Sequence, residues 1–385
     1  MRTAAALLTF IMLAAPLDAA TSGDTQFAVD LYQQLRVAKG NLFFSPYSIS
    51  VALAMVTAGA RGDTARELQE HAHLPSSPRD LALLARELDL GPAAGVELTS
   101  ANALWAQRGI PLREEYLQLV RTQFGATIGH LDFARSDAAR ETINTWASDK
   151  TKKKIPTLIG PGVLNGATRL VLTNAVYMKA KWLTPFAPRA TADLPFHFDA
   201  TNSAPVKMMW EKTYVPFAHV DGVRIVELPY VGGGLSMLIV LPDAIDGLDA
   251  VERSLTPAAL DRWAAALKPH ETVVRLPRFR SSSSFALEET LRNLGIRLAF
   301  RSDGGADFSG ISTAEKLFIA HVIHEARIDV AEEGTEAAAA TAVTVVGETA
   351  VVMPQPEMFV ADHPFLYVIR KGKAVVFMGR LRDPR

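Results

Sequence analysis

Histidines beside acidic residues are the first places where this chain of 385 residues could hold a metal ion or a catalytic base. Residues 324–328, with the sequence HEARI, begin like the helix of a zinc protease, but Ile328 stands where that helix needs its second histidine. His71 and His73 are two residues apart, so on a helix their rings would point in different directions. The local spacing therefore predicts no metal site, and no cofactor is expected.

Motifs for nucleophilic catalysis and nucleotide binding are also missing from the sequence. It has no Gly-x-Ser-x-Gly elbow and no Walker-type phosphate loop. It has no cysteine, which excludes a thiol nucleophile, a disulfide and a thiolate metal site. We name no catalytic residues and expect that the protein is not an enzyme, while a hydrolase whose triad comes from distant parts of the chain stays open as an alternative.

The composition is that of a globular protein without a strong electrostatic preference. Apolar residues make up 49% of the chain, charged residues 21%, and the formal net charge is -1. A nucleic-acid binder or a protein attracted to anionic membranes is normally more basic. We therefore expect neither nucleic acid nor a membrane as a partner.

Residues 1–20 combine one basic residue, Arg2, with an apolar stretch through Ala15 and small residues at the end. This pattern is typical of a secretory signal, so we expect a signal peptide at residues 1–20 and a secreted protein, in the extracellular medium or the periplasm. A buried N-terminal helix is the alternative, because Leu17 and Asp18 stand where a cleavage site prefers small residues.

The elements that would position any site follow from hydrophobic periodicity and breakers. Ser45 and Pro46 mark a helix start, and further helices are expected at 114–122 and 137–152. The expected strands lie mainly in the second half of the chain, at 170–178, in a hairpin over 223–243, and at 272–280, 320–330, 364–370 and 374–381. Helices and strands occur in blocks and no linker divides the chain, so we predict one α+β domain from residue 24 to residue 385.

Residues 332–348, EEGTEAAAATAVTVVGE, have contradictory local preferences. Four alanines favour a helix, whereas the β-branched residues that follow favour a strand. If the segment is a strand, Thr335 lies on a side without charge and Glu336 on the opposite side. Such a segment can be buried in a sheet as a strand, but its local preferences do not require a strand.

Several segments together resemble the serpins, the serine protease inhibitor family. The segment at 332–342 resembles the proximal hinge of the reactive loop in inhibitory members, and other motifs follow in the family's order: NLFFSPYSIS (41–50), INTWASDKTKKKI (143–155), LTNAVYMKAKW (172–182), LPRF (276–279), ADFSGI (306–311), ADHPFLYVIR (361–370) and FMGRLRDP (377–384). The resemblance implies a single domain with about nine helices, three β-sheets and an exposed reactive loop, here at about 332–353.

The function implied by the resemblance is inhibition of a serine protease, or of a cysteine protease, by a suicide-substrate mechanism. The resemblance implies that the cleaved loop, still acylated to the protease, inserts into the central sheet as a new strand and traps the enzyme in a covalent complex. We expect a monomer. The alternative is a non-inhibitory serpin that acts as a carrier, chaperone or storage protein.

The resemblance also implies roles for individual residues. Ser45, Ser48, Asn174 and His324 match the region where the central sheet opens, and Trp182 matches a tryptophan near the end where the loop first inserts. The hinge residues belong to one short segment of the chain and are Glu332, Gly334, Thr335, Glu336, Ala337, Ala338, Ala339, Ala340 and Thr341.

The scissile bond depends on how the loop is counted. The family's usual length from Glu332 places it between Glu348 and Thr349, whereas counting back from residues 362–365, DHPF, favours a bond near Met353. Glutamate at this position suits a protease with a basic primary pocket. Its neighbours Val346, Thr349 and Val352 would suit an elastase-like or subtilisin-like enzyme.

Overall fold

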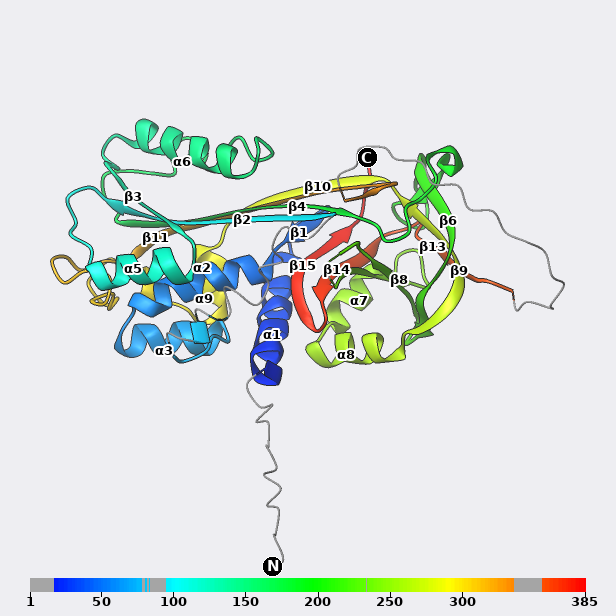
Figure 1. Ribbon diagram of the computed structural model, residues 1–385, viewed down its shortest axis with the longest axis horizontal. Coiled ribbons are helices and arrows are strands. Elements are labelled where there is room, and N and C mark those ends of the chain that lie inside the picture. The colour runs from blue at the N-terminus through cyan, green and yellow to red at the C-terminus, as the bar shows by residue number, and fades with distance from the viewer. Residues whose placement is uncertain (1–16, 78–79, 82, 84–94, 233, 336–354) are drawn as a thin grey trace, which may run out of the picture.

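Helices lie on both sides of the long sheet and beside one part of the second sheet (Figure 1). The computed structural model describes residues 17–77, 80–81, 83, 95–232, 234–335 and 355–385, with side chains from Thr25 onward. The helices in these ranges are α1 (Leu17–Leu35), α2 (Pro46–Gly59), α3 (Gly62–His71), α5 (Glu114–Gln123), α6 (Ser136–Lys150), α7 (Leu248–Ser254), α8 (Pro257–Ala266) and α9 (Glu288–Leu294). Short 3-10 turns occur at Pro188–Ala190 and Leu298–Phe300.

A six-stranded sheet forms the long axis of the fold. Its strands, in spatial order, are β10 (Phe279–Ala286), β11 (Ile319–Ala331), β12 (Gly334–Thr335), β4 (Leu170–Lys181), β2 (Val96–Gln107) and β3 (Thr127–Leu131). The order is far from the order in the chain, so this sheet can form only after distant segments meet.

The second sheet has nine strands. In spatial order they are β1 (Leu42–Phe44), β15 (Ala374–Leu381), β14 (Phe365–Lys371), β8 (Leu235–Pro242), β7 (Val223–Pro229), β6 (Ser203–Val220), β9 (Lys268–Pro277) and β13 (Glu357–Val360), with β5 (Ala192–His197) paired to β6 beside this path. The 18-residue strand β6 pairs with β5 and β9 over one part of its length and with β7 over another. Because β6 is continuous, it joins the strands around β5 and β9 to those around β7 in one sheet. The described strands therefore form two sheets, where three were expected.

Both faces of the six-stranded sheet are covered by helices, and they bury separate apolar clusters. On one face, Ile143 and Ala147 of α6 pack with Trp105 of β2 and Ala175 of β4. On the other face lies α2, which belongs to the main core together with β14 and β15. Figure 1 shows α6 on one side of this sheet and α2, α3, α5 and α9 on the other. This two-sided cover keeps strands β4 and β11 out of water.

Helix α2 shows how the sequence builds the centre of the fold. The Ser45 side chain accepts a hydrogen bond from the backbone N–H of Ser48, and Pro46 occupies the first turn, where its missing N–H has no cost. All 14 residues of α2 are buried, so its stability comes from packing on every side and not from an amphipathic face. This helix carries Ser48 to the underside of the six-stranded sheet.

The predicted α+β class is confirmed, and the helices expected at 46, 114–122 and 137–152 are α2, α5 and α6. The strands were expected mainly in the second half of the chain, and β2 (Val96–Gln107) was not predicted. The predicted signal boundary falls inside a helix, since α1 already begins at Leu17. Within the described ranges, no helix is both long and apolar enough to cross a bilayer.

Candidate functional site

The six-stranded sheet is forked at one end. Strand β11 pairs in parallel with β4 from the pair Ile319–Leu170 to the pair Arg327–Tyr177. Beyond that point the two strands separate, and β12 lies between them. Thr335 is opposite Val330 on one side and Ala180 on the other. Strand β12 is antiparallel to both neighbours, so two of the predicted hinge residues, Gly334 and Thr335, occupy a strand position in the sheet.

Gly334 is the residue that lets the chain turn into the fork. Its φ is +146°, a conformation that side-chain-bearing residues rarely adopt. A Cβ built on Gly334 would overlap the carbonyl oxygen of Ala180 and lie 2.6 Å from the Cα of Lys181. Only glycine therefore fits against the backbone of β4 here.

Thr335 is fully buried and held by an aromatic pair. Its Oγ1 is 2.9 Å from the hydroxyl oxygen of Tyr230, and the ring of Tyr230 stacks on Trp182 with 4.4 Å between ring centroids. The indole Nε1–H of Trp182 donates to the carbonyl oxygen of Ala331 at 3.0 Å, and its backbone N–H donates to that of Glu333 at 2.9 Å. Trp182 therefore contacts the chain where it enters the fork, and its predicted part in loop insertion stays a prediction.

Glu332 is anchored just before the fork. Its carboxylate accepts hydrogen bonds from the guanidinium of Arg278, with 2.6 Å from Nε to Oε1, and from the hydroxyl of Thr191. Burial alone would raise the pKa of Glu332, but the hydrogen bonds from Arg278 and Thr191 outweigh it, so the pKa lies below its ordinary value. Arg278 lies in the segment LPRF (276–279), one of the motifs that resemble the family, but the sequence did not predict that Arg278 binds Glu332.

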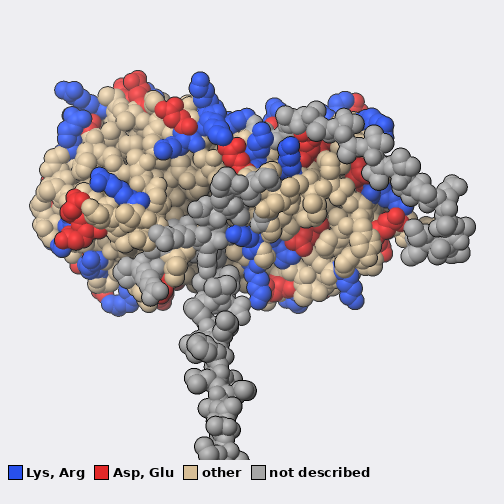
Figure 2. Space-filling view, viewed as in Figure 1, with Lys and Arg blue, Asp and Glu red and all other residues tan. Residues whose placement is uncertain are grey.

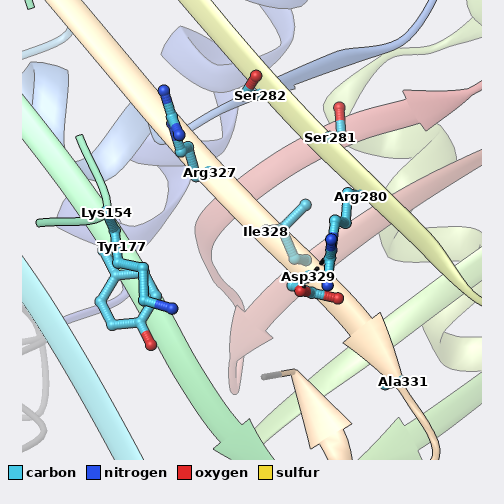
Figure 3. A pocket seen from close by; sticks show the side chains of 9 residues that line it. All are labelled: Lys154, Tyr177, Arg280, Ser281, Ser282, Arg327, Ile328, Asp329 and Ala331. Carbon is cyan, nitrogen blue, oxygen red and sulfur yellow. Dashed lines mark hydrogen bonds and ion pairs between the residues drawn. The ribbon is translucent and has the colours of Figure 1, made fainter. Parts of the chain in front are cut away.

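A cavity of about 600 Å³ opens where the strands diverge (Figure 3). The side chains around it come from β4, β10, β11 and the turn after α6: Lys154, Tyr177, Arg280, Ser281, Ser282, Arg327, Ile328, Asp329 and Ala331. Arg280 is bound to Asp329 across β10 and β11, with 2.7 Å from Nε to Oδ2. The cavity lies over the face of β10, β11 and β4 beside the fork, and Ala331, the last residue of β11, is part of its lining.

A buried polar cluster lies farther down the same strand pair, and it joins four of the predicted residues. Asn174 Nδ2 donates to Ser48 Oγ at 2.5 Å, and Asn174 Oδ1 lies 2.5 Å from Nδ1 of His324. The backbone N–H of Ser45 donates to Nε2 of His324 at 3.1 Å. Two members were missed: Asn102 accepts from Asn174 at 2.6 Å, and the hydroxyl of Ser100 is 2.6 Å from that of Ser48.

His324 is a neutral hydrogen-bonding residue in this cluster. Because its Nε2 accepts from Ser45, its proton must be on Nδ1, from which it donates to Asn174. Complete burial lowers the pKa of His324 to about 3. The pair His324–Asn174 is also a register pair of β11 and β4, so this hydrogen bond reinforces the ladder between the two strands.

The structure describes only some of the remaining predicted site residues. Glu332, Gly334 and Thr335 lie at the fork, whereas Glu336, Ala337, Ala338, Ala339, Ala340, Thr341, Glu348 and Thr349 lie outside the described residues. Thr191, Tyr230 and Asn102 carry no local signal in the sequence, because each meets its partner only through tertiary packing. Among the residues that the structure describes, no group of three or more histidine or acidic side chains could hold a metal ion.

The comparisons with known proteins agree with this geometry. A family model described as "Serpin (serine protease inhibitor)" matches residues 22–384. The chain belongs to the serpin family. This serpin is 40% identical over 378 residues to the leukocyte elastase inhibitor of Bos taurus, an alignment that covers 94% of this chain and 99% of the relative.

Solved serpin structures match nearly the whole fold. Serpin48 of the insect Tenebrio molitor superposes with a TM-score of 0.88 at 31% identity, covering 96% of this chain and all of that one. Thyroxine-binding globulin in complex with thyroxine superposes with a TM-score of 0.84 at 28% identity, covering 94% and 99%. Solved proteins whose names indicate different roles therefore share this fold.

Two predictions need correction. Secretion is contradicted by relatives named leukocyte elastase inhibitor, which align over 99% of their own length with 94% of this chain, and the supposed signal segment runs into α1 at Leu17. The predicted extracellular or periplasmic destination is wrong on this ground. The second correction concerns the prediction that the chain is not an enzyme, which rested on missing motifs. The findings that bear on this question are the names of the family and of the relatives, which denote inhibition of a protease.

Proposed function

We propose that this serpin inhibits an endopeptidase as a suicide substrate, through insertion of its cleaved reactive loop between β4 and β11. The observation that carries the proposal is the position of Gly334 and Thr335, which are paired on both sides at the head of that strand pair. Residues that follow Thr335 would extend β12 along the fork. The protease would remain covalently attached as an acyl complex with one serpin monomer.

Strand geometry favours extension of β12. One parallel ladder between β4 and β11 would be replaced by two antiparallel ladders, and antiparallel pairing is slightly more stable per residue. At about 1 kcal/mol for each added hydrogen bond, a strand of about fifteen residues adds on the order of 10 kcal/mol, which is comparable to the stability of a typical domain. Such a step does not reverse on a biological timescale.

The polar cluster around Asn174 is the part of the sheet that must rearrange. An inserted strand would separate β4 from β11 and break the hydrogen bond between His324 and Asn174. Asn174 would keep partners in Ser48 and Asn102, on α2 and β2, so its amide would not be left without hydrogen bonds. We assign to Ser45, Ser48, Asn174 and His324 the role of opening the sheet.

The target is proposed from the loop sequence and the relatives together. The bond between Glu348 and Thr349 suits a glutamyl-specific protease, whereas Val346, Thr349 or Val352 would suit an elastase-like enzyme, the type named in the relatives. The two alternatives differ in the peptide released. Cleavage after Glu348 releases a C-terminal peptide that begins at Thr349.

One experiment tests the proposal. The protein is incubated with leukocyte elastase, trypsin and a glutamyl-specific endopeptidase, and the mixtures are analysed by denaturing electrophoresis and by sequencing of the released peptide. We expect an SDS-stable complex with at least one of these proteases. Trypsin is the negative control, because residues 332–369 contain no lysine or arginine. Cleavage of the loop by leukocyte elastase and by the glutamyl-specific endopeptidase without a stable complex would contradict inhibition and favour a carrier role, which the likeness to thyroxine-binding globulin keeps as the second candidate.

A further inference from the structure

Basic side chains surround the cavity beside the fork, although the chain as a whole is almost neutral. Of the nine residues that line it, three are cations, Lys154, Arg280 and Arg327, and one is an acid, Asp329. The formal net charge of the chain is -1, so this local excess of positive charge does not follow from the composition. Figure 2 shows basic side chains on the upper edge of the molecule, over the C-terminal end of α6. The lining therefore favours an anion.

The strand register places these side chains on one face of the sheet. Tyr177 of β4 is opposite Arg327 of β11, which is opposite Ser282 of β10. Two residues along the strands, Asp329 is opposite Arg280. Residues directly opposite each other, and residues two apart in one strand, project to the same side. Because Tyr177–Arg327 is the last pair of β4 and β11 before β12 comes between them, the cavity lies next to the point where the two strands separate.

A tight turn after α6 holds Lys154 over this row. Lys152 and Lys153 have φ values of +51° and +65°, in the left-handed region that residues with a side chain rarely adopt. The Nζ of Lys154 lies 5.7 Å from the centre of the Tyr177 ring, and Figure 3 shows the two side by side. The ammonium is therefore on the β4 side of the cavity, whereas the two guanidinium groups come from β10 and β11.

The two arginines can donate to a ligand although each already binds an acid. Arg280 donates through Nε to Asp329 at 2.7 Å, and Arg327 donates through Nε to Glu325 at 2.9 Å. A guanidinium has further N–H donors on its Nη atoms, and its planar fork matches the oxygens of a phosphate. The side chains of Arg280 and Arg327 are 84% and 41% exposed, so solvent reaches both.

The size of the cavity and the spacing of its cations indicate the kind of anion. Its volume, about 600 Å³, is within the range of small-molecule sites. Neighbouring strands are about 4.8 Å apart, so the cation of β10 and the cation on the β4 side are roughly two strand spacings from each other, more than a single phosphate bridges. Tetrahedral phosphates accept hydrogen bonds from several directions, which suits donors on three strands and on a turn. These conditions fit a compact anion with two or more phosphate groups.

We propose that the cavity binds a compact polyphosphate, of the size of pyrophosphate or tripolyphosphate, and that the bound ligand holds β4 and β11 together. A strand inserted between them would move Lys154 and Arg327 apart by about 4.8 Å. A ligand bound to both loses contacts in that step, so it stabilises the form before insertion and slows trapping. The binding site stands on its own geometry, and only the effect on trapping rests on the proposed function.

Binding is tested by titration calorimetry with pyrophosphate and tripolyphosphate at constant ionic strength, with sodium sulfate as the control for a general salt effect. The variant combines Lys154→Gln with Arg280→Gln, because loss of Arg327 would leave the buried Glu325 without its arginine. We expect the dissociation constant of both polyphosphates to rise at least about tenfold in this variant.

A matched control removes the same charge elsewhere. Arg66 and Arg301 are exposed, each is paired with an acid, and neither lines the cavity. Arg66→Gln combined with Arg301→Gln should change the dissociation constant less than about twofold. Equal affinity of the parent and the Lys154/Arg280 variant overturns the site, as does equal binding of sulfate. Binding of a heparin decasaccharide without binding of pyrophosphate would assign the cations to a polymer surface and would also overturn it.

The effect on the strands is tested with a protease that the parent traps. Saturating pyrophosphate should slow formation of the SDS-stable complex at least about threefold in the parent and leave the Lys154/Arg280 variant unchanged. Activity of the protease on a small peptide substrate in pyrophosphate is the control. Binding without a change in this rate overturns the effect on the strands. If the parent traps no protease, the proposed function fails, and calorimetry still decides whether the cavity is a polyphosphate site.

Discussion

Tyr230 and Thr335 are 105 positions apart in the chain, and their buried hydroxyl oxygens lie 2.9 Å from each other. Thr335 has no exposed surface, and Tyr230 is stacked between this contact and the ring of Trp182. Burial raises the pKa of Tyr230 far above its ordinary value, so the phenol is neutral at any physiological pH. A residue at the start of the proposed reactive loop is thus already a core residue, and the position that the proposed strand addition would extend is occupied before any cleavage.

The first prediction concerns Thr335→Arg. A guanidinium cannot be buried against Tyr230 without a large desolvation cost, so insertion should stall and the protease should escape. We expect cleavage of the loop to continue while the number of inhibitor molecules used per trapped protease rises at least about tenfold. Titration of residual protease activity measures this number.

The control for this variant is its neighbour. Glu333→Arg places the same side chain at a half-exposed position, where it should have little effect on stoichiometry. Thr335→Val keeps the shape and removes only the hydroxyl, so it should inhibit nearly as the parent does. Equal inhibition by Thr335→Arg and the parent would show that this side chain is not buried during insertion.

The fold class and most elements could be predicted from the sequence, because their signals are local. Ser45 and Pro46 fix the start of α2, and runs of apolar residues mark β4, β11, β14 and β15. Strand β2 was missed because it lies in a half that otherwise reads as helical. The joining of expected sheets through β6 could not be foreseen, since it depends on which strands meet along its 18 residues.

Site residues that lie in motifs resembling the family could be named from the sequence. Residues that reach the site only through tertiary contacts could not. Ser48, Asn174 and His324 were named, and they form one hydrogen-bonded cluster. Thr191 and Tyr230 were not named, because nothing in their own neighbourhood shows that they meet the hinge. Long-range partners of this kind are specified by the whole fold and not by any window of sequence.

The second prediction concerns the close approach of Gly334 to β4. In Gly334→Ala the new Cβ would overlap the carbonyl oxygen of Ala180, so residues 334 and 335 should leave the fork. We expect faster amide hydrogen exchange at residues 330–335 and 180–182, measured by mass spectrometry. Gly160→Ala is the control, since a Cβ there has no neighbour within 4 Å. Unchanged exchange in Gly334→Ala would mean that the backbone adjusts without releasing β12.

The third prediction uses the charge pair Arg278–Glu332. The folded-state pKa of Glu332 lies below its ordinary value of 4.5, so its contribution to stability is complete above pH 4.5 and is lost as the pH falls through the folded pKa. We expect Glu332→Gln to lower the free energy of unfolding by about 1–2 kcal/mol near pH 7, with less difference from the parent below pH 4.

The control for the charge pair is an exposed one. Arg66 and Asp63 form an ion pair on the surface of α3, and Asp63→Asn should cost much less than 1 kcal/mol. Thermal unfolding of the parent and both variants between pH 3.5 and 7 provides the comparison. A constant difference between the parent and Glu332→Gln over this range would assign the loss to packing and not to charge.

The fourth prediction concerns His324, whose folded-state pKa of about 3 is below the value of 6.5 that the unfolded chain has. Between these values the unfolded state binds one proton more than the folded state, so His324 stabilises the fold fully above pH 6.5 and loses this effect as the pH falls toward 3. The slope is about 1.4 kcal/mol per pH unit. In His324→Gln, which cannot be protonated, the melting temperature should fall less between pH 6.5 and 4.5 than in the parent. Parallel curves for His324→Gln and the parent would show that the ring is not held neutral in the cluster with Asn174.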